Sequence, residues 1–372
     1  MDSNVGRWSG RALVAVAALG ALPVVSAHGG SHPQPYPQWL ALVVMAVGIA
    51  IVGGSVLLGR TVWEHRRSRT LYGVYLGLFV AAAGAVGLVQ LSPVQTLRAS
   101  QEPIARQWYQ PLTLALGTMI AVGSLVAGRL RFPERPRYAG LGMALGTWVA
   151  YPTVMSSVGA ATNPVGYALV LGLPVGVGYI LWRDAREPLS RVFSNGKARW
   201  FGVGTGVLAS LFFAFSMGMV TFVPEHGIGI PKGSFVTTAQ VANPLVYWTA
   251  VEFGFPSVPI SGVFSTGLLI QIGLVGVLVG LNGGIIANQW LGDARTGSTG
   301  AASGTAAVAA PNACCCCGPV ISELAVVSVG PSAAAPLYWL FVDLASPVGA
   351  LFFVVSVGLL VGNLALFGIR NE

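Results

Sequence analysis

Charged side chains are scarce in this chain. Only 9% of its 372 residues are Asp, Glu, Lys or Arg, whereas 54% are hydrophobic, and the mean hydropathy is +0.72. A water-soluble globular protein could not hide that much apolar surface. Apolar runs of about 20 residues, the length that a helix needs to cross a bilayer, recur along almost the whole sequence. We therefore predict an all-α, polytopic helix bundle that spans the cell membrane several times.

Acidic residues are the rarer charge, 12 against 20 basic residues, which gives a net charge of +8. Four, four and five of the basic residues lie in the loops 60–69, 129–137 and 183–199. These loops alternate with translocated ones, so the bias indicates that all three are cytoplasmic. The basic residues flank membrane helices instead of forming one broad face. We expect the lipid bilayer as a partner and no nucleic acid.

The apolar runs predict about nine transmembrane helices after a signal peptide. The predicted spans are 39–59, 71–91, 111–128, 138–159, 164–182, 200–222, 264–287, 319–340 and 346–368. The predicted organisation is a signal peptide (1–27), an extracellular N-terminal segment (28–38), a transmembrane bundle (39–288), a flexible linker (289–313) and Cys-led C-terminal transmembrane helices (314–372). No nucleophile, acid pair or phosphate loop defines an enzyme, so enzymatic activity is left open.

The first apolar segment resembles a secretory signal. Arg7 and Arg11 precede a short apolar core that ends in small residues, which predicts cleavage after Ala27 and a mature chain that begins at His28. His28 would then offer an imidazole and a free amine, and His32 a second imidazole. These nitrogen donors suit Cu(II) and Zn(II).

Two features leave the topology of the second half open. The segments that begin at Leu71 and Trp200 both follow an arginine-rich loop, and "QPLTLALG" at Gln110 corresponds to "NPLVYWTA" at Asn243, which leaves an internal duplication open. Residues 244–260 contain two prolines and a glutamate, so we expect them to lie in the interface or re-enter the membrane. If they do not cross the membrane, the later cysteines are cytoplasmic; if they do cross, as the duplication suggests, the cysteines face outside.

Cysteine is absent everywhere except at four adjacent positions: Cys314, Cys315, Cys316 and Cys317. Four consecutive side chains cannot easily wrap one tetrahedral zinc ion, which excludes a closed structural zinc site, whereas Cu(I) needs only two or three thiolates. A Gly-, Ala- and Ser-rich linker precedes the run, and Gly318 and Pro319 predict that a helix begins there. The positive end of that helix favours reactive thiolate. The alternative is that the cysteines are small apolar residues at a helix start.

Glu323 lies inside the apolar segment that follows the cysteines. An intramembrane carboxylate is costly and normally faces a protein interior, so Glu323 is a candidate for an ion pathway. The start at His28 resembles the mature end of the B subunit of particulate methane and ammonia monooxygenases. The cysteine run resembles the cysteine pairs of mercury transport proteins. Each resemblance covers a handful of residues, and we assign no family from them.

Three functions are open at this point. The chain could transport or handle a thiophilic metal ion such as copper, through the cysteine run and the N-terminal histidines. It could instead be a thiol–disulfide redox or electron-transfer component of the membrane. Thirdly, it could be a non-catalytic subunit of a larger membrane complex, a function that explains the other sequence features but not the four adjacent cysteines.

Overall fold

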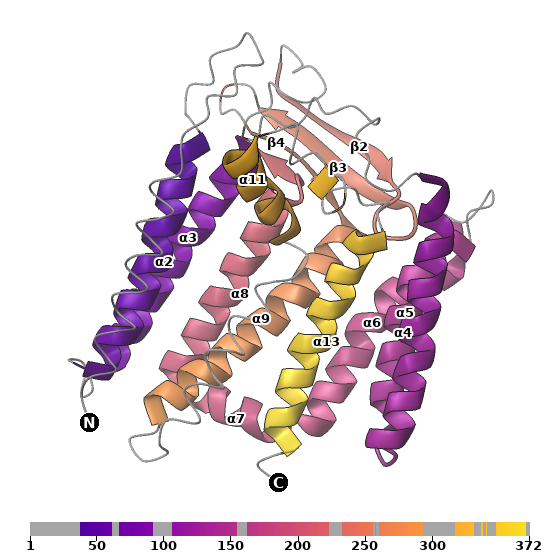
Figure 1. The fold of residues 1–372 in the computed structure, drawn as a ribbon, viewed down its shortest axis with the longest axis horizontal. Coiled ribbons are helices and arrows are strands. Elements are labelled where there is room, and N and C mark those ends of the chain that lie inside the picture. Colours follow the sequence, from indigo (N-terminus) through magenta and orange to yellow (C-terminus); the bar gives the residue numbers. More distant parts are fainter. Residues whose placement is uncertain are drawn as a thin grey trace.

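The computed structural model describes residues 38–61, 67–91, 106–154, 162–222, 233–255, 257, 260–292, 317–330, 336–337, 340 and 347–369. Long helices stand side by side, and a small β-sheet covers one end of them (Figure 1). The predicted signal peptide and most of the extracellular segment lie outside the described residues, so cleavage after Ala27 stays a prediction.

Most of the described chain is helical. The helices are α2 (Gln38–Thr61), α3 (Arg67–Gln90), α4 (Tyr109–Arg131), α5 (Pro136–Val154), α6 (Pro164–Asp184), α7 (Arg186–Ser194), α8 (Gly196–Ser216), α9 (Thr266–Gly292), α11 (Cys317–Val329) and α13 (Pro347–Ile369), and the short 3-10 helix η3 (Arg106–Trp108) precedes α4. Seven of them are long and apolar enough to cross a membrane: α2, α3, α4, α6, α8, α9 and α13.

The predicted count of nine spans is not confirmed. The 19-residue helix α5 lies antiparallel beside α4 but is not among those seven. In the region of the span predicted at 319–340, the structure has the 13-residue helix α11. This helix ends at Val329 and is followed by Gly330, whose φ is +89°. A helix of 13 residues is about 20 Å long, too short to cross a hydrocarbon layer of about 30 Å. The predicted linker boundary at 289 is also early, because α9 continues to Gly292.

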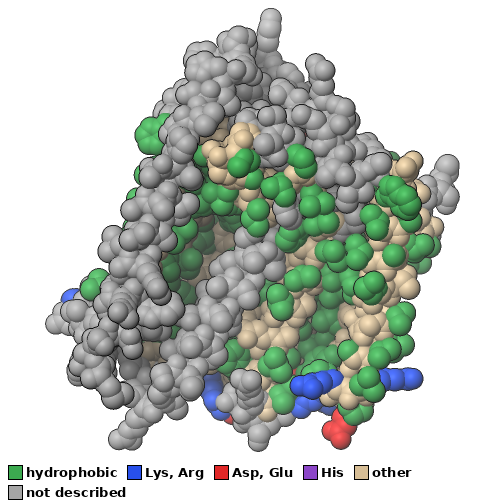
Figure 2. Space-filling model, viewed as in Figure 1, with side chains coloured by type: hydrophobic (Ala, Val, Ile, Leu, Met, Phe, Trp, Pro, Cys, Tyr) green, Lys and Arg blue, Asp and Glu red, His purple; other side chains and the backbone are tan. Residues whose placement is uncertain are grey.

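The two ends of the bundle differ in character. At one end, here called the arginine end, α2 gives way to α3, α4 turns into α5, and α7 lies across the bundle between α6 and α8 (Figure 1). The three arginine-rich segments therefore meet at one end. In Figure 2, Lys and Arg side chains gather at this end, and hydrophobic side chains cover the helices above it. The opposite end, which carries the sheet, is here called the sheet end.

The sheet is the main correction to the all-α prediction. Its strands are β1 (Val220–Thr221), β2 (Phe235–Val241), β3 (Trp248–Phe255) and β4 (Ile260–Ser265), all antiparallel to their neighbours in the order β1-β4-β3-β2. Val251 lies opposite Thr238 on one side and Phe264 on the other. Along β3 the buried Ala250 and Gly254 alternate with the exposed Val251 and Phe255, the period of two that a half-buried strand requires. Within residues 244–260, the described part is therefore strand and turn.

Glycine lets three helix pairs approach closely: α2 with α3, α4 with α5, and α8 with α9. A Cβ atom on Gly48 of α2 would lie 2.2 Å from the backbone nitrogen of Ala81 on α3. Equivalent contacts join Gly117 of α4 to Ala150 of α5, and Gly280 of α9 to Gly202 of α8. Small residues at helix contacts are typical of membrane bundles, where close backbone packing replaces the hydrophobic effect between helices.

Of the two correspondences on which the suggested duplication rests, one relates two helices and the other relates a helix to a strand region. The segments at Leu71 and Trp200 form α3 and α8, which pack against each other and run from the arginine end to the sheet end. Gln110, however, lies in the helix α4, whereas Asn243 precedes the strand β3. The second correspondence is wrong.

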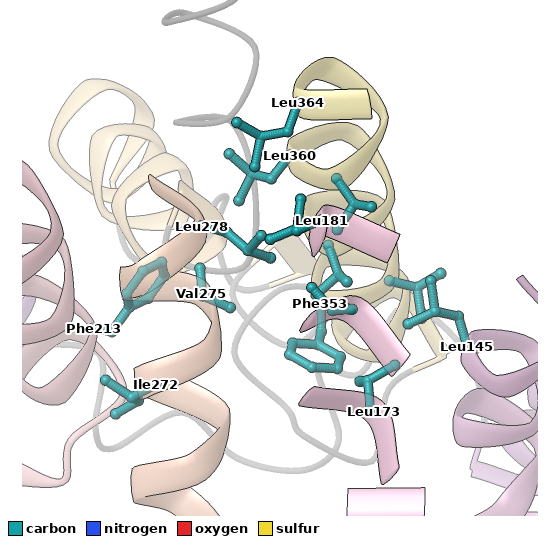
Figure 3. Packing of buried hydrophobic residues seen from close by; sticks show 14 of the residues in the cluster. Leu145, Leu173, Leu181, Phe213, Ile272, Val275, Leu278, Phe353, Leu360 and Leu364 are labelled. Atoms are coloured by element: carbon teal, nitrogen blue, oxygen red, sulfur yellow. The ribbon is translucent and has the colours of Figure 1, made fainter. Parts of the chain in front are cut away.

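The core lies where α6, α8, α9 and α13 meet (Figure 3). Leu278 of α9 and Leu360 and Leu364 of α13 are completely buried. Trp148 of α5 packs on Phe353 of α13 with ring centroids 4.9 Å apart. The Nδ2 atom of Asn363 donates a hydrogen bond of 2.6 Å to Oδ1 of Asn282, which ties α13 to α9 in the apolar interior. These contacts hold α13 parallel to α9.

Candidate functional site

Glu323 lies in the short helix α11, at the sheet end of the bundle. The helix starts with Cys317, Gly318 and Pro319, and Pro at an early helical position costs no hydrogen bond. Ser322, Glu323 and Val326 form its buried face and are 0%, 1% and 4% exposed. This face packs toward α3. The sequence therefore places a carboxyl group inside the protein, as predicted for an intramembrane glutamate.

Gln38, the first residue of α2, binds the Glu323 side chain. Its Nε2 atom donates one hydrogen bond of 3.0 Å to Oε2 of Glu323 and another of 3.0 Å to the carbonyl oxygen of Leu88. Leu88 belongs to the last turn of α3, where helix carbonyls lose their intrahelical donors. One amide thus joins the consecutive helices α2 and α3 to α11, which is far away in sequence.

The hydrogen bonds fix the orientation of the Gln38 amide. The carbonyl of Leu88 can only accept, so the atom that faces it must be the NH₂ group. An NH₂ group carries two hydrogens, and both are used. The Oε2 atom of Glu323 is therefore an acceptor in this contact. Removing either partner would remove this hydrogen bond, whose net contribution to stability is typically about 0.5–1.5 kcal/mol.

A second glutamine forms a similar clamp nearby. Gln90 is the last residue of α3, and it is 7% exposed. Its Nε2 atom donates to the carbonyl oxygens of Phe215, over 2.7 Å, and Val220, over 3.1 Å. The end of α3 is thereby tied to the end of α8 and to β1. Sequence reasoning missed both glutamines, because a single glutamine near a helix end carries no pattern.

The other predicted site residues fall mostly outside the described part of the chain. His28, His32, Cys314, Cys315 and Cys316 are among these, and only the backbone of Cys317 is described. That backbone lies in the helix α11, at the sheet end. Within the described ranges, no group of three or more His, Cys, Asp or Glu side chains could hold a metal ion. The metal ligands therefore stay predictions.

The position of Cys317 corrects one expectation. If residues 244–260 do not cross the membrane, the sequence predicts that the cysteines lie on the same side as the arginine loops, and Arg295 and Arg370 add minor support. Helix α9 does run toward the arginine end, but α11 begins at the opposite end, because Glu323 contacts the first residue of α2. The cysteines and the arginine loops cannot both be cytoplasmic. We retain the orientation from the arginine loops, which rests on many more basic residues.

Sequence reasoning also missed a buried ionic cluster at the arginine end. Asp184, the last residue of α6, is 5% exposed. Its carboxylate accepts a hydrogen bond of 2.7 Å from Nε of Arg137 and a second one from Nη2 of the same side chain. Arg135 adds a contact of 3.4 Å. The cluster anchors the start of α5 to the end of α6, so two of the arginines that indicated topology also have a structural role.

The fold defines this chain as a polytopic α-helical membrane protein with a small sheet at one end. No protein-family model, curated protein or solved structure matches it.

Proposed function

We propose that this protein handles or transports a thiophilic metal ion, such as copper, at its sheet end. The proposed ligands are the four cysteines of the run and the N-terminal histidines: Cys314, Cys315, Cys316, Cys317, His28 and His32. Glu323 would lie on the path of the ion. The observation that carries the proposal is the hydrogen bond between Gln38 and Glu323.

This hydrogen bond anchors the two predicted ligand segments at a common point. His32 precedes Gln38 by six residues, and six residues span at most about 21 Å. Cys317 precedes Glu323 by six residues of helix, which is about 9 Å along its axis. The two segments are 285 residues apart in sequence at this contact. Their shared anchor supports a site to which both contribute.

The chemistry of the two segments is complementary. Imidazole and amine nitrogens suit Cu(II) and Zn(II), whereas thiolates suit Cu(I). A carboxyl group about two turns of helix beyond the thiols adds negative charge when it ionises, and this attracts a cation. We propose that the histidines collect the ion and that the cysteine run binds it at another point on its route.

Thiol–disulfide exchange is the second candidate, and the placement of Cys317 favours it. If the arginine end is cytoplasmic, the cysteines face a compartment outside the cytoplasm, where disulfides persist. Metal analysis of the purified protein with and without reductant separates the two: bound copper supports metal handling, and a disulfide that can be titrated supports redox exchange. Unchanged function after replacement of all four cysteines by serine would favour a non-catalytic subunit of a membrane complex.

A competition titration with a Cu(I) chelator tests the metal proposal. Replacing Cys314 to Cys317 with serine should abolish Cu(I) binding without unfolding the bundle, because the substitutions remove only the thiol groups. The wild-type protein should bind more tightly as the pH rises through the thiol pKa, because protons compete for the same sulfur atoms. Glu252→Gln is a matched control, since Glu252 lies in the sheet at the same end. Equal copper retention by wild type and the serine variant would refute the cysteine site.

A further inference from the structure

Four basic side chains at the two ends of α7, where α6 ends and α8 begins, are exposed and form no ion pair with an acidic side chain in the described part of the chain. They are Arg183, Arg186, Lys197 and Arg199. Arg191 differs, because its Nη2 atom forms an ion pair with Glu187 one turn earlier on α7. We call the four residues the corner patch.

Two other basic residues at the arginine end, Arg135 and Arg137, have a structural partner. Both side chains bind the buried carboxylate of Asp184, which neutralises part of their positive charge. This contrast matters, because a positive-inside bias alone does not distinguish paired from unpaired arginines. The corner patch retains four uncompensated positive charges within a short stretch of chain.

Exposed aromatic side chains accompany the corner patch. Helix α7 lies across the end of the bundle (Figure 1) with Pro188 and Val192 buried against it, while Phe193 is 52% exposed. Trp182, next to Arg183, is 60% exposed, and Trp200, next to Arg199, is 68% exposed. Tryptophan at the end of a membrane helix lies at the level of the lipid headgroups. The basic groups beside it lie at the same level.

We propose that the corner patch binds the phosphate groups of anionic phospholipids. Arginine presents a planar fork of donors that fits phosphate oxygens, and lysine adds a point charge. Phe193 and the two tryptophans would contact the glycerol and the upper acyl chain, where amphipathic and aromatic side chains are stable. The proposal is independent of metal handling, which concerns the opposite end of the molecule.

Lipid titration of the full-length protein in detergent tests this proposal. Phosphatidylglycerol should bind more tightly than phosphatidylcholine, as counted by native mass spectrometry, and should raise the melting temperature more. Each basic residue near an anionic surface contributes roughly a factor of five in affinity. Lys197→Gln with Arg199→Gln should therefore weaken phosphatidylglycerol binding about 25-fold. The melting temperature without added lipid should stay close to that of wild type.

Helix α4 supplies a matched control at the same end of the bundle. Arg129 and Arg131 are also exposed and lie in its last turn. Arg129→Gln with Arg131→Gln removes the same charge and should leave phosphatidylglycerol binding within about twofold of wild type, since most of the local field is at the corner patch. Equal losses in the two double variants would overturn the proposal. Stabilisation by inorganic phosphate equal to that by phosphatidylglycerol would overturn the assignment to a lipid.

Discussion

At the scale of single residues, polar side chains that join distant segments organise the sheet end. Gln38 bonds α3 and α11, and Gln90 bonds α8 and β1. Each satisfies backbone carbonyls at a helix end, where water is limited and an unpaired carbonyl is costly. Ser265 has a comparable role at the start of α9, where its Oγ atom accepts from the backbone N–H of Leu268 over 3.3 Å.

A double-mutant cycle should detect the contact between Gln38 and Glu323. Gln38→Leu and Glu323→Leu should each destabilise the protein, and the double variant should lose less than the sum of the two. We expect a coupling energy of about 1 kcal/mol, as for other hydrogen bonds in membrane bundles. The measurement is thermal or denaturant unfolding in detergent. Strict additivity of the two free-energy changes would contradict the contact.

The ionic cluster at Asp184 should depend strongly on Arg137. Arg137→Gln removes both hydrogen bonds that Arg137 donates to a buried carboxylate and keeps the longer contact from Arg135, so the free energy of unfolding should fall by about 3 kcal/mol. Arg183→Gln changes an exposed arginine one residue from Asp184 and should alter stability by less than about 0.5 kcal/mol. Similar melting temperatures for the two variants would show that the cluster contributes little.

The sequence predicts the type of these residues better than their partners. Glu323 stands out because a carboxylate in an apolar segment is unusual, and the structure buries it. Its partner Gln38 lies 285 residues away, and no local pattern links the two. Asn282 and Asn363 are likewise hydrogen-bonded although they lie 81 residues apart. Tertiary packing chooses partners, and a single sequence does not contain that information.

At the scale of elements, glycine decides how closely helices pack. Gly48→Ala would place a Cβ atom 2.2 Å from the backbone nitrogen of Ala81 and 2.6 Å from its Cα atom. Helices α2 and α3 would have to separate, so we expect a loss of about 1–3 kcal/mol in the free energy of unfolding.

Gly53 provides the control in the same helix, because a Cβ atom there meets nothing within 4 Å. Gly53→Ala should stabilise α2 by up to about 1 kcal/mol, since alanine loses less backbone entropy than glycine in a helix. Unfolding in detergent measures both changes. If Gly48→Ala were as stable as Gly53→Ala, the close contact of α2 with α3 would be wrong.

Long apolar helices are predictable from sequence, and the sheet was not. Helices α2 and α13 match the predicted spans 39–59 and 346–368 within two residues, because a run of apolar residues of that length has few alternatives in a membrane. The strands β2 to β4 are short, half-buried and rich in residues that helices also tolerate in lipid. Their pairing depends on contacts between segments, such as Phe235 with Gly254, which local patterns do not reveal.

At the scale of the whole molecule, the structure predicts which side of the membrane the cysteine run faces. The chain has no cysteine outside the run at 314–317. A membrane-impermeant thiol reagent applied to intact cells should therefore label the protein only if the run faces outward. We expect labelling, because α11 lies at the end opposite the arginine loops.

Single cysteines in a background with all four native cysteines replaced by serine provide the controls. Ser234→Cys, exposed beside β2, should be labelled from outside, whereas Ser190→Cys, exposed on α7, should react only after the cells are opened. Labelling of Ser190→Cys in intact cells would reverse the orientation of the whole bundle. Intact-mass measurement of the same protein should find a chain that begins at His28 if the signal peptide is removed.

The parallel arrangement of α9 and α13 has a consequence for the path of the chain. Two consecutive long helices that run in the same direction require the polypeptide to travel back between them. Helix α9 ends at Gly292 at the arginine end, and α11 begins with Cys317 at the sheet end, so the intervening 24 residues must cover the height of the bundle. The backbone of Cys317 therefore lies at the opposite end of the molecule from Gly292, so a labelled probe attached at each of the two residues should report from opposite faces of the membrane.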